Sequence, residues 1–160
     1  MAKILVVYDS RSGNTEALAL AVAKGAESPG NVEVTVKKAE QTKPSDLLAA
    51  DGIIMGSPTY FGQMSANLKA LIDQSVQVHK QLVGKVGGAF TSSGGTASGA
   101  ETTLLSIVNA MLIHGMIVQG RADDAHYGVA VMGAPSKEDL VECEALGKNV
   151  ALLVKKLSLC

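Results

Sequence analysis

The sequence contains few aromatic residues, few cysteines and almost no net charge. Of its 160 residues, two are Phe, three are Tyr and none is Trp. The formal net charge is −1, so the chain has no basic field that would favour nucleic acid or an anionic membrane. The two cysteines, Cys143 and Cys160, form no C-x-x-C pair. This argues against a disulfide framework or a metal site and indicates a reduced, cytoplasmic compartment.

Long hydrophobic runs are also missing. The apolar run at residues 3–8 is far too short to cross a membrane, and the N-terminus shows no signal-peptide cleavage pattern, so we expect no membrane insertion. No repeat or linker interrupts the chain, and apolar residues make up 47% of it, which is enough for an independent core. We therefore expect residues 1–160 to form a single domain.

What the sequence does contain is an alternation of short apolar runs and helix-spaced apolar stripes. The runs predict five strands, at residues 3–8, 32–37, 52–56, 86–92 and 116–120. Apolar residues spaced three and four apart predict long helices through residues 18–25, 68–76, 104–112 and 140–154, with one short helical turn near 43–50. Ser136 and Asp139 have the spacing of a capping box and mark the beginning of the last helix.

This alternation predicts the fold class. Strands that alternate with helices form a parallel sheet with right-handed crossovers and helices on both faces. The sequence therefore predicts a three-layer α/β domain with a doubly wound, five-stranded parallel sheet in the order 2-1-3-4-5. In such sheets, ligands bind beyond the carboxyl ends of the strands at the point where the winding reverses, which here lies between the first and third strands.

Three polar, glycine-containing loops follow strands of this sheet. They are "SRSGNT" (10–15) after the first strand, "SPTYFG" (57–62) after the third and "SSGGTASG" (92–99) after the fourth. Because the strands are parallel, all three loops lie at the same edge of the sheet. We expect the ligand-binding site at this edge.

The first loop has the chemistry of a phosphate site. It leads into a helix N-terminus, whose free N–H groups and positive dipole end favour an anion. Ser10, Ser12 and Thr15 add hydroxyl donors, and Gly13 lets the backbone approach closely. The chain has neither the Gly-Lys-Ser/Thr of a Walker loop nor the G-x-G-x-x-G of a dinucleotide site, so a single phosphate is expected. The alternative is that Ser12 or Asn14 only caps the helix.

The other two loops suit a flat, conjugated ligand. Tyr60 is expected to stack on such a ring, whereas Phe61 is expected to pack its loop onto the core. Gly62 allows an unusual backbone conformation. The hydroxyls and glycine backbone of segment 92–95 are suited to hydrogen-bond the polar edge of a heterocycle. The alternative for that segment is a flexible crossover.

Longer stretches of the sequence resemble a known family. "GSPTYFGQMSANLKALIDQ" (56–74) and "IHGMIVQG" (113–120), together with the first loop, resemble the flavodoxin-like, WrbA-type NAD(P)H:quinone oxidoreductases, and the likeness covers nearly the whole chain. The order Ser-x-Ser-Gly-x-Thr in the first loop is even more similar to the phosphate loop of flavodoxins. Both groups bind FMN non-covalently, so the resemblance implies a flavodoxin-like, FMN-binding domain.

The resemblance also implies which residues hold the cofactor. It assigns the FMN phosphate to Ser10, Arg11, Ser12, Gly13, Asn14 and Thr15. It places the isoalloxazine ring against Pro58, Thr59, Tyr60, Phe61 and Gly62, with Ser92, Ser93, Gly94 and Gly95 on the other side. His114 matches a family histidine near the flavin, and His114 and Tyr60 are the implied catalytic residues. Without the family, His114 is interpreted as a helix-end residue that interacts with the C-terminal dipole.

The implied activity is two-electron transfer from NAD(P)H to a quinone or similar acceptor through FMN. Its partners would be a small-molecule electron donor and acceptor, and its assembly a homodimer or homotetramer. The alternative is a flavodoxin-type electron carrier without NAD(P)H turnover of its own. Two departures bear on this choice: Tyr60 stands where WrbA-type proteins usually have arginine, and the chain lacks the tryptophan with which a neighbouring subunit often borders the flavin.

Several other residues are expected to lie outside the site. Asp123, Asp124 and His126 are expected in a solvated loop, and no metal site is predicted. Cys143 falls on the buried stripe of the last helix and is expected to be an inert core thiol. A phosphate-receiver domain has this topology too, but it needs an acidic pair after the first strand, and here Asp9 stands alone.

Overall fold

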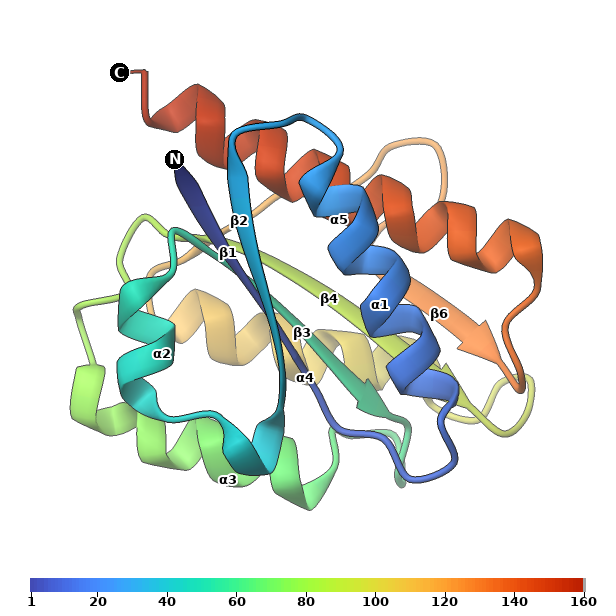
Figure 1. Ribbon diagram of the computed structural model, residues 1–160. Coiled ribbons are helices and arrows are strands. Elements are labelled where there is room, and N and C mark those ends of the chain that lie inside the picture. Colours follow the sequence, from blue (N-terminus) through green and yellow to red (C-terminus); the bar gives the residue numbers. More distant parts are fainter. Residues whose placement is uncertain (160) are drawn as a thin grey trace.

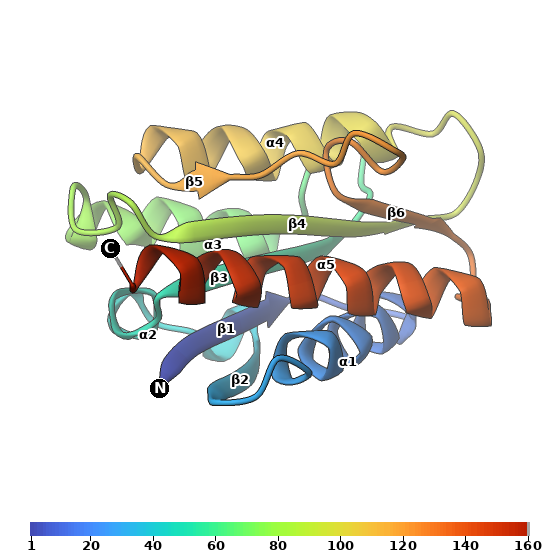
Figure 2. The ribbon, with the colours of Figure 1, turned by 90° about the horizontal axis from the view of Figure 1, so that it is seen from above.

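The computed structural model describes residues 1–159, in which a sheet of parallel strands lies between two layers of helices (Figures 1 and 2). The strands are β1 (Ala2–Tyr8), β2 (Val32–Lys38), β3 (Gly52–Pro58), β4 (Val86–Ser93), β5 (Ile117–Val118) and β6 (Val129–Met132). The helices are α1 (Asn14–Glu27), α2 (Pro44–Ala49), α3 (Ala66–Gln74), α4 (Ala100–Ile113) and α5 (Lys137–Leu157), with 3-10 turns at Ala39–Gln41 and Ser75–Val78.

The strands follow the predicted doubly wound order. The sheet runs β2-β1-β3-β4-β5, and every neighbouring pair is parallel. Helices α1 and α5 cover one face, and α2, α3 and α4 cover the other (Figure 2). The predicted three-layer α/β class and strand order are therefore confirmed.

The fifth strand differs from the prediction over 116–120 because it is split in two. β5 contains only two residues and pairs with the start of β4, whereas β6 pairs with the end of β4 at Phe90–Ser93. Residues 119–128 leave the sheet between them. The sequence does not predict β6 because a strand of four residues, with alternate side chains exposed, carries too short a pattern to distinguish from a loop.

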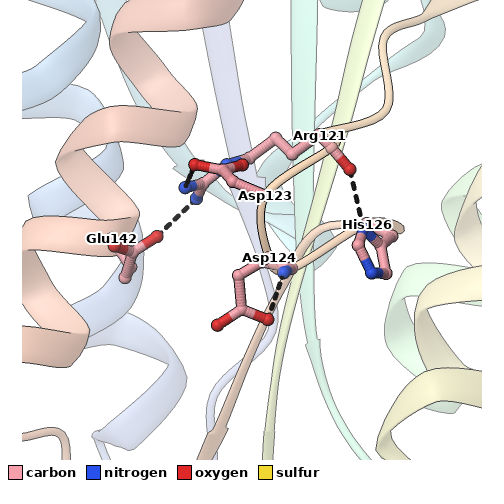
Figure 3. Close-up of polar contacts among 6 residues, drawn as sticks. Arg121, Asp123, Asp124, His126 and Glu142 are labelled. Carbon is pink, nitrogen blue, oxygen red and sulfur yellow. Dashed lines mark hydrogen bonds and ion pairs between the residues drawn. The ribbon is translucent and has the colours of Figure 1, made fainter.

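The loop between β5 and β6 is tied to helix α5 (Figure 3). The Arg121 guanidinium forms ion pairs with Glu142 of α5 and with Asp123, and the Arg121 carbonyl accepts a hydrogen bond from His126 Nδ1 at 2.7 Å. The Asp124 carboxylate accepts one from the backbone N–H of Ala125 at 2.8 Å. These ion pairs and hydrogen bonds hold the loop in its conformation. Within residues 1–159, no group of three or more His, Cys, Asp or Glu side chains could hold a metal ion.

Alternating side chains of the central strands build two cores. On β1, Ile4 and Val6 pack toward α1 and α5, while Leu5 and Val7 pack toward α2, α3 and α4. Each fully buried aliphatic side chain stabilises the fold by about 1.5–3 kcal/mol. The central strands therefore have no face free for solvent, and their ends and loops are what remains available for a ligand.

Helices α1 and α5 approach so closely that only glycine fits between them. A Cβ atom added to Gly25 would lie 1.9 Å from the Glu144 carbonyl oxygen, and one added to Gly147 would lie 1.9 Å from that of Val22. Cys143 is fully buried in the same interface, and burial raises the pKa of its thiol to about 12. The prediction of a buried Cys143 is confirmed. Where the chain is described, no helix is both long and apolar enough to cross a membrane.

The close helix contact leads to a stability prediction. Gly147→Ala places a methyl group against the α1 backbone, and we expect it to lower the free energy of unfolding by about 1–3 kcal/mol, as overpacking does. Lys148→Ala, on the exposed side of the same helix, should change it by no more than about 0.5 kcal/mol. Urea unfolding measures both. A more stable Gly147→Ala protein, as helix propensity alone would give, would contradict the packing argument.

Candidate functional site

The structure brings the three polar loops together at the carboxyl ends of β1, β3 and β4, at the lower right of Figure 1. Two backbone hydrogen bonds join neighbouring segments there. Asp9 N donates to the Gly56 carbonyl at 3.0 Å, and Thr59 N donates to the Ser92 carbonyl at 2.7 Å. The expected grouping of segments 10–15, 57–62 and 92–95 is therefore present within one chain.

The first loop leaves the N-terminus of α1 open. Its N-cap is Gly13, with φ +94°, and no described side chain caps the helix. Neither Ser12 nor Asn14 therefore caps the helix, and that alternative is wrong. Ser10 Oγ instead accepts a hydrogen bond from Gly13 N at 3.1 Å, which shapes the loop itself. The first N–H groups of α1 remain available for an anion.

The loop after β3 (the ring loop, residues 59–63) is a tight hairpin. Tyr60 and Gln63 exchange two backbone hydrogen bonds of 3.1 and 3.0 Å. Phe61 and Gly62 between them have φ values of +51° and +72°, which is the type I′ pattern. Tyr60 is 39% exposed, but Phe61 is fully exposed at the tip, so the expectation that Phe61 packs onto the core is wrong.

The ring loop rests on the start of α4. A Cβ atom added to Gly99, which has φ +95°, would lie only 2.6 Å from the Gly62 Cα atom. Gly99 was not among the predicted site residues, although its position just before a helical stripe is a sequence signal for such a contact. The two loops that flank the expected ring position are thus in direct contact.

The end of β4 is held by hydroxyl groups. Thr91 Oγ1 donates to the Ser57 carbonyl at 2.7 Å and lies 2.9 Å from Thr59 Oγ1. Ser92 Oγ lies 2.8 Å from Thr15 Oγ1, in a buried contact with the first loop. Ser93 Oγ donates to the Gly95 carbonyl at 3.2 Å and closes a local turn in this segment.

Two further contacts at this edge are not predicted from the sequence. Asn67 of α3 donates a hydrogen bond to the Asp9 carboxylate at 3.2 Å, and the Tyr8 hydroxyl donates one to Glu16 at 2.9 Å. Burial and the Glu16 carboxylate raise the pKa of Tyr8. The only sequence signal for Asn67 and Glu16 is their position in the first turn of a helix that follows a site loop. Both contacts hold the first loop between α1 and α3.

His114 lies away from the other predicted site residues. It is the C-cap of α4, whose 14 residues run from the ligand edge to the opposite edge of the sheet, a length of about 20 Å. There its Nε2–H donates to Ser75 Oγ at 2.7 Å, because the Ser75 hydroxyl hydrogen is already donated to the Ile72 carbonyl at 2.6 Å. Within one chain, His114 is the helix-end residue that the sequence alone suggested.

The surroundings of His114 disfavour its charged form. It is 9% exposed, its Nδ1 has no hydrogen-bond partner among residues 1–159, and the His79 ring lies 5.8 Å away. Burial, with a smaller contribution from His79, lowers the pKa of His114. Both histidines line a groove of about 560 Å³ between α3 and α4.

Comparison with known proteins identifies the family. Residues 44–124 match the family described as NADPH-dependent FMN reductase. A relative from Archaeoglobus fulgidus, "NAD(P)H dehydrogenase (quinone)", is 38% identical over an alignment of 192 residues that covers 98% of this chain and all of the relative. The structure of a "flavodoxin, WrbA-like protein" from Agrobacterium tumefaciens matches with a TM-score of 0.82 at 27% identity, covering 98% of this chain and 99% of that one. The chain belongs to the flavodoxin-like, WrbA-type family.

A second relative shows how close the WrbA-type family lies to electron carriers. A "Flavodoxin" from Aquifex aeolicus is also 38% identical, over 94% of this chain and 86% of the relative. The resemblance of the first loop to flavodoxins and of residues 56–74 to WrbA-type proteins is consistent with both matches. The WrbA-type assignment therefore establishes the family and its FMN chemistry but leaves the residues that hold FMN to be argued from this structure.

The lowered pKa of His114 predicts a pH dependence of stability. As the pH falls below about 6.5, the unfolded chain binds a proton at His114 that the folded protein resists, so the free energy of unfolding decreases. We expect His114→Gln to lose part of this decrease between about pH 7 and pH 5. Urea unfolding at a series of pH values measures it. Equal slopes in the two proteins would contradict the burial of an uncharged histidine.

Proposed function

We propose that this protein binds FMN at the three loops and uses it to transfer two electrons from NAD(P)H to a quinone or a similar small acceptor. The observation that carries the proposal is the juxtaposition of an uncapped helix N-terminus with an aromatic hairpin at the same sheet edge. The first feature suits a phosphate and the second suits a flat ring, and FMN has both on one molecule. The family to which the chain belongs supports the same cofactor.

The residues at the first loop fit an FMN phosphate without a lysine. We assign the phosphate to Ser10 through Thr15, with the N–H groups at the start of α1 as donors and Arg11 as an exposed cation. The helix contributes about half a positive charge at this end. Each hydrogen bond to a charged oxygen contributes about 1.5–3 kcal/mol, so a few such bonds suffice to retain the ligand.

The ring is assigned to the position between segments 58–62 and 92–95, at the carboxyl ends of β3 and β4. Tyr60 has the partial exposure that a stacking partner needs, and the backbone of Phe61 and Gly62 is presented at the hairpin tip. FMN supplies the hydride chemistry, and the protein's part is to orient the ring and to shape access to it. The exposed Tyr60 and Phe61 side chains are accessible to a flat donor or acceptor of the kind the activity requires.

The proposed role of His114 requires a second subunit. His114 lies at the end of α4 about 20 Å along the helix from the loop at residues 92–99, so we assign its contact to the flavin of a neighbouring chain. A homodimer or homotetramer would allow this, and we propose such an assembly in the cytoplasm. Within the subunit, the direct cofactor contacts are assigned to the three loops.

The second candidate function is a flavodoxin-type electron carrier. It is favoured by the Aquifex aeolicus flavodoxin relative and by Tyr60 at the ring position. The two candidates share the cofactor and its site. They differ in whether NAD(P)H reduces the bound flavin.

Anaerobic spectroscopy of the FMN-loaded protein tests the function. We expect NADH or NADPH to bleach the visible absorbance of the bound flavin, and benzoquinone to restore it with sustained turnover. A yellow protein that neither nucleotide reduces would favour the carrier. A colourless preparation that does not take up added FMN would contradict both.

Replacement of Gly13 tests the phosphate assignment. Valine at φ +94° costs about 1–3 kcal/mol of backbone strain and distorts the donor loop, so we expect Gly13→Val to weaken FMN binding at least about tenfold. Gly30→Val is the matched control, because Gly30 also has a positive φ of +69° and open surroundings but lies in the α1–β2 turn at the other edge. Fluorescence titration with FMN compares them. Equal affinity of both variants for FMN would contradict the assignment.

A further inference from the structure

Ser92 is the residue at which the three loops meet. It belongs to β4, its side chain is almost fully buried, and its hydroxyl lies 2.8 Å from Thr15 Oγ1 at the start of α1. Its carbonyl accepts the N–H of Thr59, in the ring loop, at 2.7 Å. The pairing of Ser92 with Pro58 on one side and Val131 on the other holds its backbone inside the sheet. Ser92 therefore has a fixed position relative to both the first loop and the ring loop.

The contact with Thr15 raises the question of which hydroxyl donates. A hydroxyl has one hydrogen to donate and can accept two. If Thr15 donated to Ser92, the Thr15 hydrogen would no longer be available to a phosphate in the first loop. If Ser92 donates to Thr15, the Thr15 hydrogen remains available for that phosphate. Within residues 1–159, the Ser92 hydroxyl has no other hydrogen-bond partner, so nothing else competes for its hydrogen.

We propose that Ser92 is a positioning residue for the phosphate rather than a contact of the flavin ring. Its hydroxyl donates to Thr15 Oγ1, and this leaves the Thr15 hydroxyl to donate to a phosphate oxygen. An anionic acceptor favours this arrangement over the reverse, since hydrogen bonds to charged oxygens are the stronger ones. The two bonds form a chain in which each polarises the other. The inference rests on the proposed FMN site.

The position of Thr15 supports this division of roles. Thr15 is 1% exposed, so few groups other than Ser92 and a ligand in the first loop can reach its hydroxyl. Its neighbour Ser12 is exposed, and Ser10 Oγ already accepts the Gly13 N–H. Orientation by a second group is therefore most effective at Thr15. Ser92 acts through Thr15, and the hydrogen bond from Thr59 N to the Ser92 carbonyl keeps Ser92 itself in place.

Comparison of FMN with riboflavin separates the proposal from direct ring contact. Riboflavin has the same ring without the phosphate. We expect Ser92→Ala to weaken FMN binding about tenfold and to leave the dissociation constant of riboflavin within about twofold of the wild-type value. Ser92→Thr keeps the hydroxyl and should restore FMN affinity. Equal losses for the two ligands would overturn the proposal in favour of a ring contact, and no loss for either would also overturn it.

A double-mutant cycle tests whether Ser92 acts through Thr15. In a Thr15→Val background, the addition of Ser92→Ala should cause no further loss of FMN affinity. Additive losses would overturn the proposal. Thr103→Val is the control for removal of a buried hydroxyl, because Thr103 Oγ1 donates only to Gly99 within its own turn and should leave the ratio of FMN to riboflavin affinity unchanged. Wild-type protein that binds neither ligand would contradict the proposed function itself. This outcome is distinct from a failure of the Ser92 proposal, in which the wild-type protein still binds FMN.

Discussion

The structure depends on the burial of both faces of its central strands. β1 and β3 lie between two helix layers, and a strand with no wet face can meet a ligand only at its ends. Parallel pairing then places the carboxyl ends of β1, β3 and β4 at one edge, together with the loops that follow them. The site is therefore a consequence of how the core is packed, because any shift of one strand would separate its loop from the other two.

Most of the groups available to a ligand at that edge are uncharged. The three loops carry backbone N–H groups, serine and threonine hydroxyls and the Tyr60 ring, and Arg11 is the one cation of the first loop. Such groups need to be held in place, since a neutral donor that points away contributes little. The hydroxyl pairs Thr15–Ser92 and Thr59–Thr91, and the close contact of Gly62 with Gly99, supply that rigidity. The loops thus support one another before any ligand is considered.

The sequence predicted the features that repeat over many residues. Buried strands, helix stripes and the Ser136 capping box have clear patterns, and the structure has them where expected. The missed features depend on tertiary context. Phe61 turns outward because a type I′ hairpin directs it there, and β6 is a strand only because β4 offers an edge. His114 lies at the opposite end of α4 from the loop at residues 92–99 because α4 is antiparallel to the sheet. The spacing of residues along the chain predicts none of these features. It does not predict the contact between the Ser92 and Thr15 hydroxyls either, because these residues are far apart in the sequence.

The split fifth strand has a consequence for how proteins of this architecture can diverge. β5 and β6 are anchored to β4 independently, so the ten residues 119–128 between them are not constrained by sheet register. Tyr127 in this segment lines a cavity together with Glu101 at the start of α4, close to the edge where the loops gather. Changes in the length or composition of this segment would remodel the approach to the site while the scaffold stays intact. The break in the strand thus gives the fold a segment that can vary in sequence and length, so selectivity for small molecules can evolve there separately from stability.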